Sequence, residues 1–398
     1  MTQKIHLIAT EESGDRLGSA LMRELKQRFG DDVVFSGVGG SSMAREGLKS
    51  LFPIEQLSII GIAAVVKKLP SILKLIAQAT EDVLRTKPDV LVIIDSPDFT
   101  QRVAKRVHKR DTSIPIVNYV SPTVWAWRPG RAKAMRAYVD HVLALLPFEP
   151  DAHQRLGGPP CTYVGHPLIE QIDTLRPNAE EQARRDRKPP VLLVLPGSRR
   201  SEIRHHMETF GVTLDLLRKR GMAFELVLPT MPHLVEGISE AVKAWPVQPQ
   251  IVVGEAEKRA AFRIAHAAFA KSGTVTLELA LAGVPMVTAY KAGSVEAWII
   301  RRRITSSSVI LANLVIGENV VPEFIQEDCT PEKLAASLQD VLGDTPMRRR
   351  QVEAMAKLDD IMGIGRASPS KAAADVVADV LNRRAGEAQP SSADRMHS

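Results

Sequence analysis

Residues 267–290 decide the fold and read Ala-Ala-Phe-Ala-Lys-Ser-Gly-Thr-Val-Thr-Leu-Glu-Leu-Ala-Leu-Ala-Gly-Val-Pro-Met-Val-Thr-Ala-Tyr. The apolar run Ala267–Ala270 predicts a buried parallel strand. Val275–Ala282 predicts a core-facing helix that ends at Gly283, and Val284–Tyr290 predicts the next strand. The stretch is therefore typical of one strand-turn-helix-strand unit of an α/β protein.

The turn inside this unit is Ser272-Gly273-Thr274, in which two hydroxyls that can cap a helix flank a glycine that lets backbone approach a ligand. Backbone amides at the start of a helix attract phosphate, and Glu278 on the first turns can accept hydrogen bonds from ribose hydroxyls. The turn suggests a nucleotide site, although the same pattern also occurs as plain turn chemistry.

The composition is that of a globular protein with more than one domain. The chain has 398 residues, of which 44% are hydrophobic and 25% charged, and this length favours two domains. The formal net charge of +6 favours anionic partners but does not choose among a nucleotide, a nucleic acid and an acidic membrane. The two cysteines, Cys161 and Cys329, have no metal-ligand spacing, so neither a disulfide framework nor a metal site is expected.

Apolar runs separated by helical patterns occur in two series, which predicts two Rossmann-like halves with a cleft between them. The first series of expected strands is Ile5–Ala9, Val33–Gly37, Val90–Ile94, Ile114–Val120, Val142–Leu145 and Thr162–Val164. The second is Val191–Leu195, Phe224–Leu228, Gln250–Val253, Ala267–Ala270 and Pro285–Ala289. The polar segment Asn178–Pro190 between them is the expected linker.

Candidate catalytic residues follow two of these strands. Asp98 comes just after Val90–Ile94 and suits a general base, while Arg199 comes after Val191–Leu195 and suits a group that stabilises a leaving diphosphate. Asp98 in Ser-Pro-Asp is equally consistent with a helix cap, and Arg199 with a surface arginine. His166, which precedes a proline, is expected to be structural.

Taken together, these motifs resemble lipid-A-disaccharide synthases, inverting glycosyltransferases of the GT-B fold, over roughly residues 3–380. The matching stretches are Glu11-Glu12-Ser13-Gly14-Asp15, Gly37-Val38-Gly39-Gly40, Ile94-Asp95-Ser96-Pro97-Asp98-Phe99, Tyr119-Val120-Ser121-Pro122-Thr123-Val124-Trp125-Ala126-Trp127-Arg128, Leu145-Leu146-Pro147-Phe148-Glu149, Tyr163-Val164-Gly165-His166-Pro167-Leu168, Leu195-Pro196-Gly197-Ser198-Arg199, Ser272-Gly273-Thr274 with Glu278, and Val321-Pro322-Glu323.

The resemblance implies transfer of 2,3-diacylglucosamine from UDP to the 6-hydroxyl of 2,3-diacylglucosamine 1-phosphate, which gives a β-1,6 disaccharide and UDP in lipid A assembly. It implies no cofactor and no bound metal. In the family pattern Asp98 matches an essential aspartate and Arg199 an arginine important for activity. The residues expected on the UDP side are Gly197, Ser198, Ser272, Gly273, Thr274, Glu278 and Asn313. Those expected on the acceptor side are Glu11, Ser13, Gly14 and Trp125.

An acylated substrate lies in a membrane, so the apolar and basic segment Ile59–Ile76, together with Trp298–Arg303, is expected to contact the cytoplasmic face of the inner membrane peripherally. The residues expected to make this contact are Ile59, Ile60, Ile62, Val65, Val66, Lys67 and Lys68. An ordinary core segment is the alternative for this patch. Two positions depart from the family pattern, Thr10 in place of a glycine and Ala64 in place of a glutamate.

The expected organisation has an acceptor and membrane-facing domain at 1–177, a UDP-sugar domain at 191–345, helices at 346–384 that cross back to the first domain, and a disordered tail at 385–398. Another GT-B enzyme acting on a UDP-hexosamine, such as an N-acetylglucosaminyltransferase or an epimerase, is the alternative function. A nucleic-acid-binding role is disfavoured because basic residues are scattered and no binding motif is recognisable. An oligomer is possible.

Overall fold

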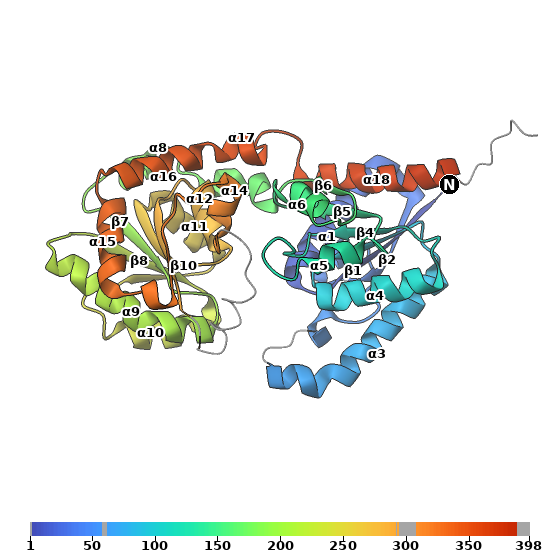
Figure 1. The fold of residues 1–398 in the computed structure, drawn as a ribbon, viewed down its shortest axis with the longest axis horizontal. Helices are drawn as coiled ribbons and strands as arrows, with labels where there is room; N and C mark the ends of the chain where they lie inside the picture. Colours follow the sequence, from blue (N-terminus) through green and yellow to red (C-terminus); the bar gives the residue numbers. More distant parts are fainter. Residues whose placement is uncertain (1, 58–61, 292, 294–307, 388–398) are drawn as a thin grey trace, which may run out of the picture. The chain divides into compact units, whose positions relative to one another are not determined.

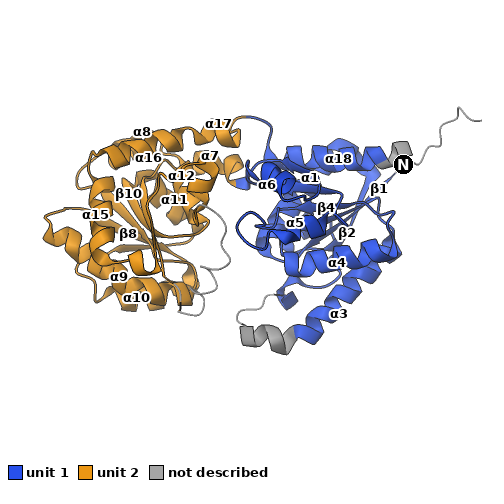
Figure 2. Ribbon diagram, in the orientation of Figure 1, with its two compact units in different colours: residues 1–167, 366–398 blue, residues 168–365 orange. Residues whose placement is uncertain are grey.

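The computed structural model describes residues 2–57, 62–291, 293 and 308–387 (Figure 1). The chain divides into two compact units, Met1–Pro167 with Arg366–Ser398, and Leu168–Gly365 (Figure 2). Each unit is built around one sheet of six parallel strands, so the predicted α/β class with two Rossmann-like halves is confirmed.

The first sheet has the strand order β2-β1-β3-β4-β5-β6. Its strands are β1 Gln3–Ala9, β2 Val33–Val38, β3 Val90–Ile94, β4 Ile116–Tyr119, β5 His141–Ala144 and β6 Cys161–Tyr163. The helices of this unit are α1 Glu12–Phe29, α2 Ser41–Arg45, α3 Ile62–Thr86, α4 Pro97–Arg110, α5 Gly130–Met135, α6 Glu149–Arg155 and α18 Pro369–Glu387. The order reverses between β1 and β3, and ligands of open α/β sheets bind at such a switch point.

The second sheet has the order β12-β11-β10-β7-β8-β9, so its switch point lies between β7 and β10. Its strands are β7 Val191–Leu195, β8 Glu225–Thr230, β9 Gln250–Val253, β10 Ala267–Lys271, β11 Met286–Tyr290 and β12 Glu323–Ile325. The helices are α7 Ile172–Leu175, α8 Ala179–Arg185, α9 Arg200–Lys219, α10 Val235–Val242, α11 Glu255–Ile264, α12 Val275–Leu281, α14 Leu311–Ile316, α15 Pro331–Leu342, α16 Pro346–Ala356 and α17 Leu358–Met362.

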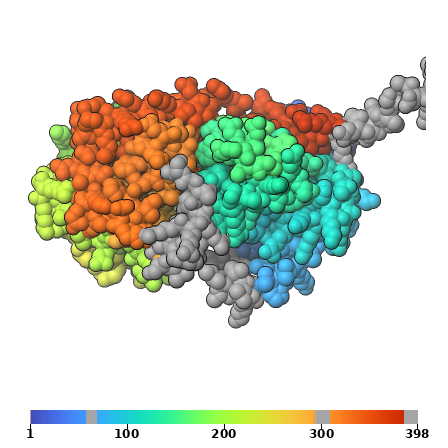
Figure 3. Space-filling model, viewed as in Figure 1, coloured from blue at the N-terminus to red at the C-terminus, as the bar shows by residue number. Residues whose placement is uncertain are grey.

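Helices cover both faces of the first sheet, as its continuous apolar strands require. On one face Leu21 of α1 and Val377 of α18 belong to the same buried cluster as Leu7 of β1. On the other face Val83 of α3 and Val103 of α4 pack with the sheet. The helix α18 thus belongs to the first unit although it comes last in the chain, and its outer side forms part of that unit's surface (red in Figure 3).

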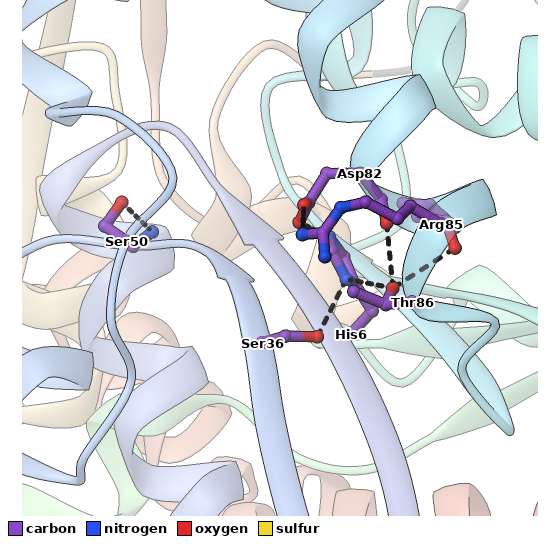
Figure 4. Close-up of polar contacts among 8 residues, drawn as sticks. His6, Ser36, Ser50, Asp82, Arg85 and Thr86 are labelled. Carbon is purple, nitrogen blue, oxygen red and sulfur yellow. Dashed lines mark hydrogen bonds and ion pairs between the residues drawn. The ribbon is translucent and has the colours of Figure 1, made fainter.

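A buried histidine joins β1 to α3. His6 is fully buried, and its Nδ1 lies 2.9 Å from the Ser36 hydroxyl and 3.5 Å from the Thr86 hydroxyl (Figure 4). Its Nε2 lies 4.0 Å from Asp82, which is itself paired with Arg85. Burial lowers the pKa of His6 to about 4, against a smaller raising effect of Asp82, so the ring is neutral at neutral pH.

The segment 178–190 differs from the predicted linker. Asn178 and Glu181 form a capping box that begins helix α8, and Arg185 at its end is buried within the second unit. The Arg185 guanidinium donates to the carbonyls of Phe262 and Arg263 at the end of α11 and to those of Ala282 and Gly283 after α12. Carbonyls at the ends of helices favour a cation, which explains why this basic segment is folded.

The end of the chain is partly described. Helix α18 extends to Glu387, three residues into the predicted disordered tail, and residues 388–398 lie outside the described residues. Among the described residues, no helix is both long and apolar enough to cross a membrane. The predicted domain boundaries stay a prediction.

Candidate functional site

Two turns predicted to bind phosphate meet at the switch point of the second sheet. Strands β7 and β10 are direct neighbours, with Leu195 in register with Ala270, so the turns that follow them lie side by side. Between them opens a cavity of about 370 Å³. Its lining residues include Gly197, Ser198, Arg199, Glu202, Thr230, Met231, Lys258, Lys271, Gly273, Thr274 and Glu278. Most of the residues expected on the UDP side are therefore brought together.

The loop after β7 depends on a glycine and a carboxylate. Gly197 has φ +135°, and a Cβ placed there would lie 2.6 Å from Glu202 Cβ. Glu202 accepts a 3.0 Å hydrogen bond from the Ser198 amide and one of 3.1 Å from Lys271 Nζ. Burial alone would raise the pKa of Glu202, but these two donors outweigh it and lower the pKa. The carboxylate thereby fixes the loop, while the Arg199 side chain is 80% exposed.

The turn after β10 is built differently from the prediction. Helix α12 starts at Val275 as expected and ends before Gly283, which has φ +65°. The expected capping by Ser272 and Thr274 is wrong, because neither hydroxyl caps α12. Thr276 instead donates to the Gly273 carbonyl, at 2.8 Å. Within the part of the chain that the structure describes, the buried Ser272 hydroxyl has no partner.

Glu278 lies on α12 at the wall of the cavity and is paired with Lys258 of α11. The Glu278 Oε2 to Lys258 Nζ distance is 2.8 Å, and Lys258 also lies 3.0 Å from Glu255. Burial alone would lower the pKa of Lys258, but the two carboxylates outweigh it and raise the pKa. Lys258 is thus charged at neutral pH, and its charge is matched by two acidic partners.

Asn313 does not line this cavity. It is buried in α14, where its side-chain oxygen accepts from the Val321 amide at 2.9 Å. Its side-chain nitrogen donates to the Val321 carbonyl at 2.9 Å and to Glu323 at 2.8 Å. The amide therefore holds the segment that leads into β12, and its expected role in the nucleotide pocket stays a prediction.

In the first unit, acidic residues gather where β1 and β3 end. Glu11 accepts a 3.0 Å hydrogen bond from the Ser96 hydroxyl, so the two turns touch. Asp95 and Ser96 have φ +51° and +44°, a left-handed pair that is costly outside glycine. Burial raises the pKa of Asp95 and the neighbouring charge of Glu11 adds to this, although the Ser96 amide opposes it.

Asp98 stands in the first turn of α4, two residues after the N-cap Ser96, and is not itself the cap. Its side chain is 82% exposed, and its Oδ1 lies 3.2 Å from Arg131 Nη2. Ser13 on the neighbouring α1 is exposed, and Gly14 packs against Ala9 and Ile94. An exposed carboxylate at a switch point is available to a ligand, which a buried cap would not be.

Trp125 is fastened to the start of α6. Its Nε1 donates to Glu149 at 3.2 Å, and its ring lies edge-on to Phe148 with centroids 5.1 Å apart. Burial raises the pKa of Glu149 to about 7. The hydrogen bonds that Glu149 accepts, above all from the Leu146 amide, lower the pKa but do not outweigh burial. A second link joins the Ser121 hydroxyl to His153 Nε2 at 2.9 Å. The loop that carries Trp125 is therefore held by buried polar groups.

Other predicted residues fall elsewhere. Burial lowers the pKa of His166 to about 4, and its expected structural role stays a prediction. Of the segments expected at the membrane, residues 59–61 and 298–303 lie outside the described residues, and only backbone is described for 62–68. Among the described residues, no cluster of three or more His, Cys, Asp or Glu could hold a metal ion.

Comparison with known sequences decides the family. The model of the lipid-A-disaccharide synthetase family matches residues 5–377. A lipid-A-disaccharide synthase of Rhodopseudomonas palustris strain BisB18 is 71% identical over 379 residues, which cover 95% of this chain and 96% of the relative. One from Rhodospirillum centenum is 43% identical over 96% of this chain and 95% of the relative.

The chain belongs to the lipid-A-disaccharide synthetase family. It is accordingly a glycosyltransferase of lipid A biosynthesis. Members of this family act on UDP-sugar and lipid substrates, which agrees with a cavity built from two phosphate-friendly turns.

Solved structures agree on the fold alone. The UDP-GlcNAc 2-epimerase from Neisseria meningitidis, bound to UDP-GlcNAc, has a TM-score of 0.62 at 11% identity and covers 96% of this chain and 100% of its own. A glycotransferase of kitacinnamycin has a TM-score of 0.56 at 17% identity, with the same coverage. These neighbours support the GT-B fold, and at such low identity they do not favour the epimerase alternative over the family.

Sequence reasoning missed four polar residues of the cavity, Glu202, Thr230, Lys258 and Lys271. Lys271 directly precedes the Ser272 turn, so its position at a strand end was a usable signal. Thr230 was missed because the expected strand stopped at Leu228, two residues early. Lys258 gives no local signal, since its partner Glu278 is distant in the sequence. A larger groove of about 870 Å³ between α9 and α10 contains none of the predicted site residues.

Proposed function

We propose that the protein transfers 2,3-diacylglucosamine from UDP-2,3-diacylglucosamine to the 6-hydroxyl of 2,3-diacylglucosamine 1-phosphate. The products are the β-1,6-linked disaccharide 1-phosphate and UDP. One observation carries the donor half of this proposal: Gly197 to Arg199, Gly273, Thr274 and Glu278 surround a single cavity where the strand order reverses. Support for the acyl groups of both substrates comes from membership of the family.

In the proposed donor complex the diphosphate lies against the Gly197 and Gly273 turns, where side chains are small and backbone amides are near. Glu278 accepts hydrogen bonds from the ribose hydroxyls, and its ion pair with Lys258 holds the carboxylate in place. Arg199, exposed at the cavity, balances the negative charge that grows on UDP as the bond to the sugar breaks.

On the acceptor side, Asp98 is proposed as the base. The 6-hydroxyl oxygen attacks the anomeric carbon, the bond from that carbon to the UDP oxygen breaks, and the hydroxyl proton passes to the Asp98 carboxylate. Arg131 contacts Oδ1 of Asp98, so the proton would go to Oδ2. Glu11, Ser13, Gly14 and Trp125 are proposed to line the acceptor side with it.

We also propose a peripheral contact with the cytoplasmic face of the inner membrane through the start of α3. The described residues that support it are Leu69 and Leu73, which lie within the apolar and basic segment and are 42% and 38% exposed. Exposed leucines next to lysines are typical of helices that lie at an anionic lipid surface.

The donor assignment is tested by nucleotide binding to Glu278→Gln. Loss of a charged hydrogen-bond acceptor predicts that UDP affinity falls about tenfold or more. The same variant should lose the preference for UDP over 2′,3′-dideoxy-UDP, because that preference would come from the ribose contact. Glu318→Gln, which alters an exposed pair with Arg350 in the same unit, is the matched control and should bind UDP as the wild type does. An unchanged preference in Glu278→Gln would refute the ribose role.

A further inference from the structure

Lys271 lines the cavity proposed to bind the donor, and no role has yet been assigned to it. It is the last residue of β10, immediately before the Ser272 turn, and its side chain is only 16% exposed. Its Nζ lies 3.1 Å from Glu202 Oε1 and 5.2 Å from the centre of the Tyr290 ring. The ammonium is therefore held from two sides at the wall of the cavity.

The charge of Lys271 is only partly matched. Glu202 is its acidic partner, but the same carboxylate also accepts the Ser198 amide and lies 3.7 Å from the Arg199 guanidinium. Lys258, in contrast, pairs with two carboxylates, Glu278 and Glu255, although Glu255 also pairs with Arg259. One negative charge thus serves two cations and an amide, which leaves this side of the cavity suited to a further anion.

A second observation points to a ligand in the same place. The hydroxyl of Thr230 at the end of β8 lines the cavity, is more than nine-tenths buried, and has no hydrogen-bond partner in the part of the chain that the structure describes. Buried hydroxyls are nearly always paired in a functional state. A ligand with oxygen acceptors would pair with the Thr230 hydroxyl and with the partly matched charge of Lys271.

We propose that Lys271 is a donor-binding residue whose ammonium contacts the diphosphate of the UDP-sugar, and that Glu202 is a positioning residue that holds Lys271 and the Gly197 loop. The inference rests on the proposed donor site. When the anomeric carbon-oxygen bond breaks, its electron pair stays on the phosphate oxygen. Lys271 then faces the added negative charge and does not itself transfer a proton.

A purely structural ion pair between β10 and α9 is the competing explanation, and ligand truncation separates the two. Binding of UDP, UMP and uridine would be measured by calorimetry for the wild type, Lys271→Met and Lys271→Arg. A contact with the diphosphate predicts that Lys271→Met weakens UDP binding about tenfold or more and leaves uridine binding within about twofold. Lys271→Arg should recover most of the loss, because it restores the charge.

Lys333→Met is the matched control, since it removes another paired lysine of the same unit whose partner is the exposed Asp328, and it should bind all three ligands normally. Equal losses of UDP and uridine in Lys271→Met, or no loss of either, would overturn the inference. Thermal unfolding checks that the variant is folded, and Lys271→Gln replaces it if it is not. If the wild type does not bind UDP, the donor site itself is refuted. If the wild type and Lys271→Met bind UDP equally, only the role of Lys271 is refuted.

Discussion

Replacing Gly197 by alanine should damage the donor loop by two separable effects. The first is backbone strain, because φ is +135° at this position and L residues rarely adopt it. The second is a collision, because the new Cβ would lie 2.6 Å from Glu202 Cβ and 2.8 Å from its Oε2. Glu202 would then have to leave the Ser198 amide and Lys271.

Each effect has a magnitude. Backbone strain of this kind costs about 1–3 kcal/mol. Loss of the Ser198 hydrogen bond to a charged acceptor adds roughly 1.5 kcal/mol or more. Gly221→Ala gives the matched control, since Gly221 has φ +78° in the same unit and nothing lies within 4 Å of its added Cβ. The control should therefore show strain alone, about 1–2 kcal/mol.

Urea unfolding and UDP titration of both variants measure the two effects. Gly197→Ala should lose about 3–4 kcal/mol of unfolding free energy and bind UDP at least about tenfold more weakly. Gly221→Ala should lose less stability and bind UDP as the wild type does. If Gly197→Ala is no less stable than Gly221→Ala and keeps full UDP affinity, the contact with Glu202 does not shape the loop.

Three further predictions concern other parts of the chain. Arg185→Met removes four hydrogen bonds to buried or partly buried carbonyls and should lower the unfolding free energy by about 3 kcal/mol or more. Arg184→Met, which alters an exposed pair, should change the unfolding free energy by less than about 1 kcal/mol. Equal effects of the two variants in urea unfolding would contradict this. The pKa of His6 is about 4 in the folded protein and near 6.5 when unfolded, so the unfolded state gains the proton first. Its contribution is full above pH 6.5 and is lost as the pH falls to 4, by about 3 kcal/mol in all, and His6→Gln should flatten that part of the stability profile measured by urea unfolding. Asp98→Asn should lower kcat by about 100-fold or more with little change in the acceptor KM if Asp98 is the base; a raised KM with unchanged kcat in steady-state assays would assign it to acceptor positioning instead.

The strands and their order of appearance were predictable because parallel strands buried on both faces are continuous apolar runs. Val191–Leu195 and Gln250–Val253 agree to the residue. The edge strand Glu323–Ile325 was not predicted, since it is three residues long and only half buried. Helix α8 was not predicted, because its segment is rich in arginine and proline, as linkers are. The carbonyls that accept hydrogen bonds from the buried Arg185 come from segments about 80 to 100 residues away.

The parts of the site formed by turns after strands were predictable from the sequence. The ion pairs between side chains far apart in the sequence were not. The turns at Ser198 and Gly273 follow strands of recognisable pattern, and the sheet order then brings them together. The pairs Lys271 with Glu202 and Lys258 with Glu278 join residues that share no local motif. The amide of Asn313 is engaged by Val321 and Glu323, contacts that no local pattern around the residue reveals.

The most direct measurement of the central claim is the transfer reaction itself. Purified protein would be incubated with UDP-2,3-diacylglucosamine and 2,3-diacylglucosamine 1-phosphate in detergent with EDTA, and the products analysed by mass spectrometry. We predict equal amounts of UDP and a tetraacyl β-1,6 disaccharide 1-phosphate. UDP without disaccharide would contradict the acceptor assignment, and neither product from a folded sample, with or without added metal, would contradict the proposed reaction.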